Sequence, residues 1–459
     1  MTSLKELPQD HMVILLASRF DLNEGGHFYW YTKEMITELN MHHPNYLVLS
    51  PPILGDELPN FIDAHWQFID DLSAWGHDTG IQSPKKLVKK MLPILDSLGK
   101  SESITLISFE SSLSMIVALL ELQRRVPVLQ ISVNLLDHGF WLKLLSTKVP
   151  IVRFLIRDFT RILQNANESF KLLHPSLSQV DSFSRLLGFR VFPFSHISAF
   201  WKFSSMPLQT SPNETRVLIL PWSADLDHVK KFIDSVFMEI GVTFRAHIHF
   251  KTLVDLQYFR EHIRVETFDK IDYSVGVLSL HEYISLFKQS DLAWIPYTDF
   301  YHQITGSGRA FDCLTLGCPL IIDQKSDLAL MVANFPLIFL CPDSNTSWIS
   351  KYIDLIRKEK SIANSYLERR LELEKLGANL FSPLNGINSF LKPLDSNVKH
   401  HNHSFMARDF HSLVILYHLT FFLAKIMAVK KWCLNSHRKL RAVHYSHRRL
   451  FTKIRLFKS

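Results

Sequence analysis

The chain has 459 residues, of which 47% are hydrophobic and 21% charged, so it can fill two cores and is too apolar to be disordered. Its net charge of +7 is concentrated at one end, because residues 430–459 carry ten lysines and arginines and no acid. The rest of the chain is close to neutral, which argues against a nucleic-acid-coating surface and predicts no nucleic-acid partner.

The cysteines and the N-terminus both indicate a reducing, cytoplasmic setting. The four cysteines follow neither a metal-ligand spacing nor a disulfide framework: Cys313, Cys318, Cys341 and Cys433. We expect no bound metal ion, and we expect the first two cysteines to be small buried side chains. Residues 1–11 lack the charged and apolar segments of a secretory signal.

The first half of the chain alternates short apolar runs with helical patterns, as a parallel sheet covered by helices does. Strands are predicted at residues 12–17, 46–49, 104–108, 126–133 and 190–194. Helices are predicted at residues 27–39, 85–90 and 112–124, with 143–190 forming helices broken by loops. Gly25 and Gly26 follow the first strand, where they form either a ligand-binding loop or simply a tight turn.

The loop after the strand at 126–133 contains Asp137 and His138. The carboxyl edge of a parallel sheet is where α/β proteins bind ligands, so His138 is a candidate for catalysis or sugar contact. The alternative is an ordinary solvated histidine.

A polar stretch with two prolines, residues 204–214, is the predicted linker to a second domain. After it, strands are predicted at residues 216–220, 244–250, 274–278, 292–295, 320–322 and 336–340. Helices are predicted between or after them at residues 226–240, 253–262, 280–289, 309–316 and 348–374. The alternation again predicts a doubly wound parallel sheet.

Residues 290–323 are the most informative stretch, because they combine a strand, a turn, a helix, a glycine and a second strand in a right-handed βαβ order. Gly317 and Pro319 predict the end of the helix. The turn before the helix contains small residues: Thr305, Gly306, Ser307 and Gly308. Backbone N–H groups and the positive helix end therefore converge on one point, where an anion would bind.

The order of residues in this stretch resembles the donor-binding segment of GT-B glycosyltransferases, especially the retaining group 1 (family 4) enzymes. The positions in step with that pattern are Asp291, Leu292, Pro296, Gly308, Asp312, Gly317, Pro319 and Ile321. The resemblance covers roughly residues 10–395. It implies that Asp312 binds the ribose of a nucleotide sugar and that residues 305–309 bind its diphosphate. It also implies that Gly25 and Gly26 lie near the donor phosphates and that His138 is the nearest equivalent of a functional histidine.

Two positions depart from the family pattern. The family carries a further acid eight residues before the ribose acid, and Ile304 stands there. No cation occurs between Leu220 and Lys230, where the family has an arginine and a lysine for the diphosphate. Arg309 is the candidate substitute, since a guanidinium matches phosphate oxygens, and a solvated arginine is the alternative.

The tail begins with a polar, histidine-rich stretch at 395–411, which is either a linker or a metal-binding segment. Residues 412–429 form an apolar run whose stronger polar groups are His418 and Lys425. With 18 residues and these two side chains, the run barely meets the requirements of a membrane-spanning helix. With the basic residues behind them, we expect an interfacial helix on an anionic membrane surface. The alternatives are packing on the body of the protein, or a basic end that binds nucleic acid or an acidic glycan.

We therefore predict an α/β protein of GT-B architecture, with two Rossmann-like domains facing across a cleft and a basic helical tail. The predicted division is an acceptor domain at 1–203, a linker at 204–214, a nucleotide-sugar-binding domain at 215–394 and the tail at 395–459. The predicted activity is a cofactor-free, metal-independent, retaining hexosyltransferase. It would move a sugar from a nucleotide-diphosphate sugar to a glycan or lipid-linked acceptor, in the cytoplasm or at the inner membrane face. The alternatives are an inactive, membrane-associated scaffold and a nucleotide-sugar epimerase.

Overall fold

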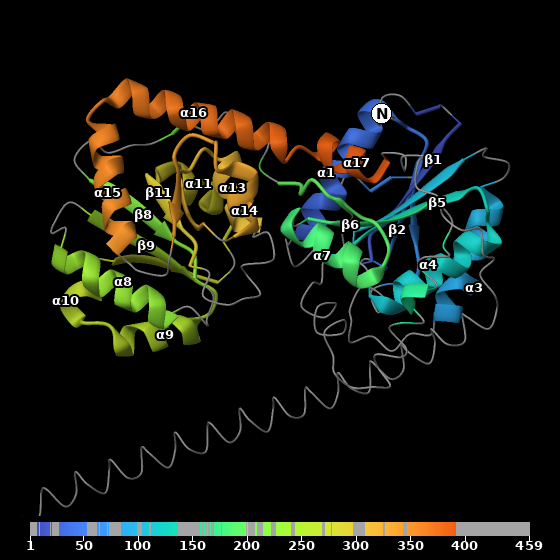
Figure 1. Ribbon diagram of the computed structural model, residues 1–459, viewed down its shortest axis with the longest axis horizontal. Coiled ribbons are helices and arrows are strands. Elements are labelled where there is room, and N and C mark those ends of the chain that lie inside the picture. Colours follow the sequence, from blue (N-terminus) through green and yellow to red (C-terminus); the bar gives the residue numbers. More distant parts are fainter. Residues whose placement is uncertain are drawn as a thin grey trace, which may run out of the picture.

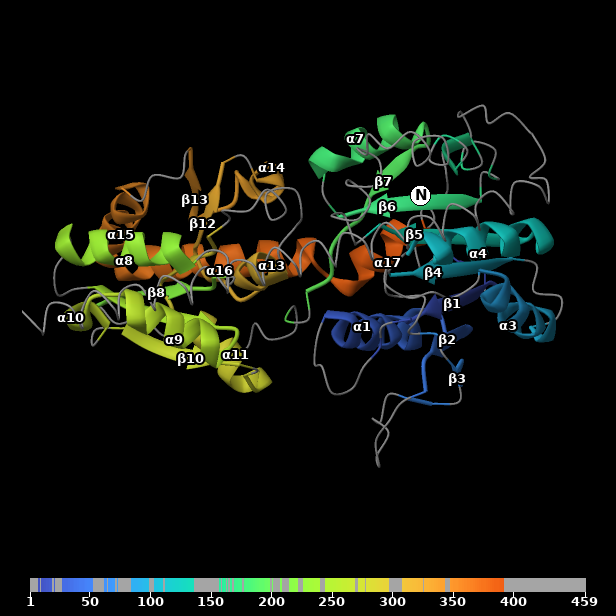
Figure 2. The same ribbon diagram turned by 90° about the horizontal axis from the view of Figure 1, so that it is seen from below.

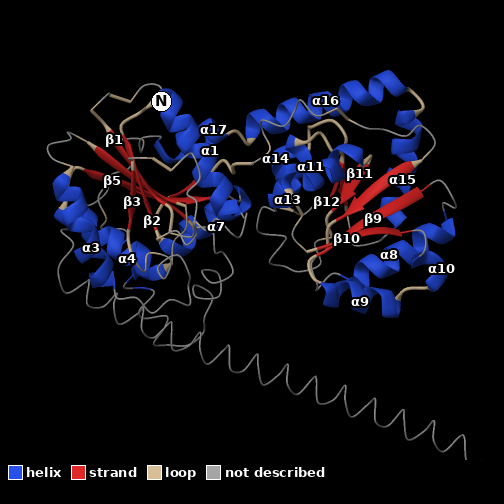
Figure 3. Cartoon of the chain, turned by 180° about the vertical axis from the view of Figure 1, so that it is seen from behind, coloured by secondary structure: helices blue, strands red, loops and turns tan. Residues whose placement is uncertain are grey.

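The computed structural model describes most of the chain up to residue 391. The described residues are 7–8, 10–18, 20, 27–52, 62–63, 65–70, 72, 84–98, 103–109, 112–135, 157, 159–161, 163, 166, 169–175, 177–198, 200, 207–208, 214–221, 226–239, 244–268, 271–276, 278–296, 308–324, 326–342 and 347–391. They form two lobes that lie side by side, each with a sheet inside and helices outside (Figures 1 and 3).

The first lobe contains a parallel sheet in the order β3-β2-β1-β4-β5-β6-β7. Its strands are β1 (Met12–Leu16), β2 (Tyr46–Ser50), β3 (Trp66–Phe68), β4 (Ile104–Ser108), β5 (Leu129–Asn134), β6 (Phe170–His174) and β7 (Val191–Pro193). Its helices are α1 (His27–His42), α3 (Pro84–Ser97), α4 (Leu113–Arg125) and α7 (Leu177–Leu187). Strand β1 has side chains that are fully buried on both faces, as expected for a central parallel strand.

The second lobe contains a parallel sheet in the order β10-β9-β8-β11-β12-β13. Its strands are β8 (Thr215–Ile219), β9 (Phe244–Phe250), β10 (Ile271–Val275), β11 (Leu292–Trp294), β12 (Leu320–Asp323) and β13 (Ile338–Cys341). Its helices are α8 (Leu226–Glu239), α9 (Leu253–His262), α10 (Val265–Phe268), α11 (Leu280–Gln289), α13 (Gly308–Thr315), α14 (Asp327–Val332), α15 (Ser347–Lys360) and α16 (Ala363–Leu380). The strand order reverses between β8 and β11, which makes their carboxyl ends the topological switch point.

The chain crosses back to the first lobe at its described end. Helix α16 runs along the second lobe, and α17 (Pro383–Leu391) lies against α1 of the first (Figures 1 and 2). The carbonyl oxygen of Phe390 accepts hydrogen bonds from Ser132 Oγ at 2.7 Å and from Lys171 Nζ at 2.9 Å. Helix α17 therefore completes a core whose strands come from the first part of the chain.

Three sequence predictions are wrong in detail. Residues 143–190 were predicted to form helices broken by loops, but Phe170–His174 is a buried strand of the first sheet. The strand predicted at 274–278 lies at Ile271–Val275, because Gly276 adopts a left-handed conformation with φ of +81° and ends it. The helix predicted at 348–374 is divided between α15 and α16 by a break at residues 361–362.

Within the described residues, no helix combines the length and the apolar character that crossing a bilayer requires. The same residues contain no group of three or more histidine, cysteine or acidic side chains placed to hold a metal ion. The predicted interfacial helix at 412–429 and the whole tail lie outside the described residues. Cys313 and Cys318 are fully buried free thiols, as predicted from the sequence.

Candidate functional site

The candidate site lies at the switch point of the second sheet, where α13 begins. Arg309, the second residue of α13, donates hydrogen bonds from Nη1 to the carbonyl oxygens of Leu220 at 3.2 Å and Pro221 at 3.3 Å. Both carbonyls directly follow the carboxyl end of β8. A cation is thus fixed beside the positive end of a helix, at the sheet edge where α/β proteins bind ligands.

Two glycines hold α13 in place. Gly317 ends the helix with φ of +65°, and a Cβ there would lie 2.8 Å from the carbonyl oxygen of Arg370. On the other helix, α16, Gly377 lies against the backbone of α13: a Cβ there would lie 2.5 Å from the carbonyl carbon and oxygen of Leu314. The backbones of α13 and α16 therefore touch, which only glycine permits at these positions.

Asp312 is bound by side chains from three parts of the chain. Its Oδ2 accepts a hydrogen bond from the Tyr283 hydroxyl at 3.0 Å, and its Oδ1 accepts one from the Ser198 hydroxyl at 3.2 Å. Burial raises the pKa of Asp312 to about 7, although both hydrogen bonds and the charge of Arg309 act in the opposite direction. Because Ser198 lies in the segment after the first sheet, the carboxyl group joins the two lobes.

A second contact between the lobes lies beside Asp312. The hydroxyl of Tyr31, on α1, is hydrogen-bonded to the ring of His196. The ring of His196 packs on Phe311 of α13, with centroids 4.2 Å apart. Burial, followed by the charge of Asp312, raises the pKa of Tyr31 well above its ordinary value. Helix α13 is therefore packed from both lobes.

Sequence reasoning missed two histidines on β9: His249 lies at the same edge, and His247 lies two residues further from it. His247 Nε2 and His249 Nδ1 are each hydrogen-bonded to Ser274 Oγ on β10, both at 2.9 Å. Burial, followed by the charge of Arg309 and by the neighbouring His247, lowers the pKa of His249 to about 4. The available signal was their spacing, because residues two apart in a strand face the same side of the sheet.

Of the residues predicted to form the site, the structure places Gly308, Arg309 and Asp312 together on the first turns of α13. The other predicted site residues lie outside the described residues: Gly25, Gly26, His138, Thr305, Gly306 and Ser307. Ile304, which stands where the family pattern has an acid, lies outside them as well. The described part of the site is therefore a helix start, one arginine, one buried carboxyl group and His249.

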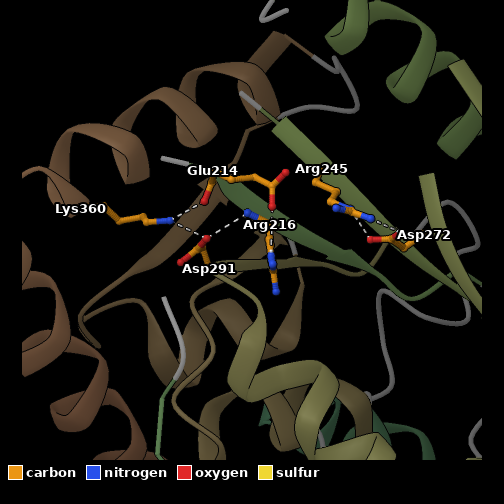
Figure 4. Close-up of polar contacts among 6 residues, drawn as sticks. All are labelled: Glu214, Arg216, Arg245, Asp272, Asp291 and Lys360. Carbon is orange, nitrogen blue, oxygen red and sulfur yellow. Dashed lines mark hydrogen bonds and ion pairs between the residues drawn. The ribbon is translucent and has the colours of Figure 1, made fainter. Parts of the chain in front are cut away.

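The opposite edge of the same sheet carries a network that holds the strands together (Figure 4). Lys360 Nζ lies 2.7 Å from Asp291 Oδ2 and donates a hydrogen bond to the carbonyl oxygen of Glu214, also at 2.7 Å. Asp291 Oδ2 accepts a further hydrogen bond from the backbone N–H of Arg216 at 2.9 Å. Because Asp291 is fully buried, this ion pair fixes α15 to the starts of β8 and β11, and the acid has a structural role.

The chain resembles known proteins in its fold and not in its sequence. No protein-family model matches the chain, and no curated protein matches its sequence. Solved structures do match. A glycosyltransferase from Rickettsia africae ESF-5 is 9% identical, with a TM-score of 0.56 over 83% of this chain and 96% of that one. The chain has the GT-B fold.

Two further solved structures share this fold. The N-terminal domain of trehalose-6-phosphate phosphatase from Candida albicans is 11% identical, with a TM-score of 0.56 over 85% of this chain and 97% of that one. A trehalose-6-phosphate structure from E. coli bound with UDP-2-fluoro glucose is 11% identical, with a TM-score of 0.54 over 83% and 97%. At such identities the similarity concerns the fold, and the predicted two-domain GT-B architecture is confirmed at that level.

Proposed function

We propose that this protein is a glycosyltransferase that uses a nucleotide-diphosphate sugar. The observation that carries the proposal is Arg309, fixed at the start of α13 and at the carboxyl end of β8. A guanidinium and the N-terminus of a helix both favour a diphosphate. The E. coli neighbour, bound with UDP-2-fluoro glucose, supports this class of donor.

The proposed reaction breaks the bond between the anomeric carbon of the sugar and the diphosphate oxygen. A hydroxyl oxygen of the acceptor forms the new bond to that carbon and loses its proton. Negative charge develops on the departing diphosphate, so Arg309 and the α13 helix end act by stabilising it. In this proposal the transferred sugar is a hexose with retained configuration, no metal ion or organic cofactor is needed, and the acceptor is a glycan or a lipid-linked glycan.

The same proposal assigns parts to the two lobes and the tail. Residues 1–203 bind the acceptor, residues 204–214 are a linker, and residues 215–394 bind the donor. We also propose that the tail, residues 395–459, attaches the protein to an anionic membrane surface through residues 412–459, on the cytoplasmic side. The support is compositional: an apolar run precedes ten cations without an acid.

The test is thermal unfolding with UDP, GDP, ADP, CDP and dTDP. At 100 times its dissociation constant a ligand adds about 2.7 kcal/mol to the free energy of unfolding, which raises the melting temperature by a few degrees. We expect a shift with one of the diphosphates, and we expect Arg309→Gln to reduce it. Arg216→Gln is the matched control, because Arg216 lies at the opposite edge of the same sheet (Figure 4).

The result then selects the function. A shift in the wild type and in Arg216→Gln, together with transfer of sugar from the matching nucleotide sugar, supports the transferase. No shift with any diphosphate would refute the donor site. A product that contains only an altered nucleotide sugar, formed without an acceptor, would instead identify an epimerase.

A second candidate function is a GT-B-shaped scaffold without transfer activity. One observation favours it: both carboxylate oxygens of Asp312 already accept hydrogen bonds, from Tyr283 and Ser198. A neighbour of the same fold is described as part of a phosphatase. The scaffold predicts no turnover of any nucleotide sugar, whether or not a diphosphate binds.

A further inference from the structure

Three neighbouring strands place a row of residues along the carboxyl edge beside Arg309. In the pairing of β8 with β9, Ile219 is opposite Ile248, so Leu220 comes level with the next residue of β9, His249. In the pairing of β9 with β10, His249 is opposite Ser274. The guanidinium of Arg309 is bound to the carbonyl oxygen of Leu220, which places it at one end of this row.

His249 is a buried side chain with one ring nitrogen engaged. It is only 7% exposed, and its Nδ1 is hydrogen-bonded to Ser274 Oγ. Ser274 Oγ is also hydrogen-bonded to His247, so its single proton cannot be given to both rings. Among the described residues, no group binds Nε2 of His249. Nε2 is therefore the ring nitrogen that a ligand could bind.

The charges around His249 are arranged for an anion. Arg309 on α13 and His247 on its own strand are the charged or titratable groups that act on it, and Ser274 contacts it from β10. The negative charge of Asp272 acts on the pKa of His247 and not on that of His249. Asp272 forms an ion pair with Arg245, nearer the start of β9. Asp312, the nearest acid along α13, is bound by Tyr283 and Ser198.

We propose that His249 and Arg309 together bind one phosphate group of the nucleoside diphosphate, with His249 Nε2 as a hydrogen-bond donor. This inference rests on the proposed function. The phosphate offsets the charge of Arg309, which is one of the causes that keep His249 neutral. Binding is therefore coupled to uptake of a proton by His249, and affinity rises as the pH falls from 8 to 6.

Isothermal titration calorimetry tests this with the full chain, using the five nucleoside diphosphates and inorganic pyrophosphate as probes. Titrations in buffers of different ionisation enthalpy count the protons taken up. We expect His249→Ala to weaken binding by roughly tenfold to a hundredfold, as loss of a charge-assisted hydrogen bond does. His249→Gln keeps a donor near Nε2 but cannot be protonated, so it should restore part of the affinity without His249's proton uptake.

His247→Gln is the matched control, because His247 shares the Ser274 contact but lies two residues further from the edge. It should bind as the wild type does. Unaltered affinity in His249→Ala, with its melting temperature unchanged, would overturn the inference while leaving the donor site standing. Pyrophosphate binding that depends on His249, without binding of any nucleoside diphosphate, would keep the inference and refute the proposed function. Binding of no probe to the wild type would refute both.

Discussion

At the scale of single residues, the sequence predicted the position of Asp312 but not its hydrogen-bond partners or its charge state. Its spacing from Gly308 and Gly317 placed it on the helix where the structure has it. Its partners come from elsewhere, because Ser198 lies 114 positions earlier in the chain and Tyr283 lies on α11. Such distant contacts decide whether a carboxyl group is charged, and no local pattern encodes them.

The raised pKa of Asp312 predicts how stability depends on pH. Its pKa is about 7 in the folded chain and 3.8 in the unfolded chain, so the folded state binds more protons between these values. The free energy of unfolding should fall as the pH rises from about 4 through about 7, by up to a few kcal/mol, because each pKa unit corresponds to about 1.4 kcal/mol.

Urea unfolding at pH 5, 6, 7 and 8 tests this with Asp312→Asn, which cannot ionise. Relative to the wild type, we expect the variant to gain in free energy of unfolding from pH 5 to about pH 7, and then to keep a constant margin up to pH 8. Parallel curves for the two proteins across this range would show that Asp312 is ionised in the folded chain at pH 5 already.

At the scale of elements, the sequence predicts strands that are purely apolar and misses those with polar residues. Strand β6 was missed because Lys171 and His174 interrupt its apolar run. The charge of Lys171 is accommodated by the carbonyl oxygen of Phe390, 219 residues later. Strand β12 was found because its apolar run directly follows Gly317 and Pro319, which end the preceding helix. A buried polar group with a distant partner is therefore the physical reason for the error.

The close contact between α13 and α16 predicts whether alanine at position 377 raises or lowers the free energy of unfolding. Replacing a helical glycine with alanine ordinarily stabilises the helix by up to about 1 kcal/mol. Gly377→Ala should instead destabilise the protein by about 2 kcal/mol, because the new Cβ would lie 2.5 Å from the backbone of Leu314. Gly386→Ala on α17 is the matched control. Its Cβ would lie 2.4 Å from Cγ1 of the buried Ile197, so it should also destabilise the protein, but by less than Gly377→Ala because a side chain and not a backbone has to shift.

Chemical denaturation of the two variants measures the difference. If Gly377→Ala raised the free energy of unfolding, α13 and α16 would be further apart than the structure places them. That outcome would also weaken the account of Gly317, whose Cβ would meet the backbone of the same helix.

At the scale of the whole molecule, the chain order and the cores do not coincide. Helix α17 follows the second sheet in sequence, yet Ile387, Phe390 and Leu391 belong to the core around β1 and α1. The two segments that connect the lobes are also bonded to each other, since the N–H of Ser198 donates to the carbonyl oxygen of Phe381 at 3.0 Å. These contacts hold the chain where it crosses back to the first lobe.

This arrangement predicts that a change late in the chain destabilises the first lobe. Phe390 is 1% exposed and packs on Phe194 and Phe109, with ring centroids 4.9 and 5.6 Å away. Phe390→Ala should cost about 3–5 kcal/mol, the usual range for a buried phenylalanine. Hydrogen exchange should accelerate in β1, β4 and β5 and stay slow in β8 and β11, because opening of the first core does not require opening of the second.

Phe232→Ala is the matched variant in the second lobe. Phe232 is fully buried in the second core, with its ring centroid 4.6 Å from that of Trp294. It should accelerate exchange in β8 and β11 and leave β1, β4 and β5 protected. If both variants instead accelerated exchange equally in the two sheets, the lobes would unfold as one cooperative unit. The contacts that Ser198 and α13 make between the lobes would then couple the two cores, and ligand binding at α13 would stabilise both lobes at once.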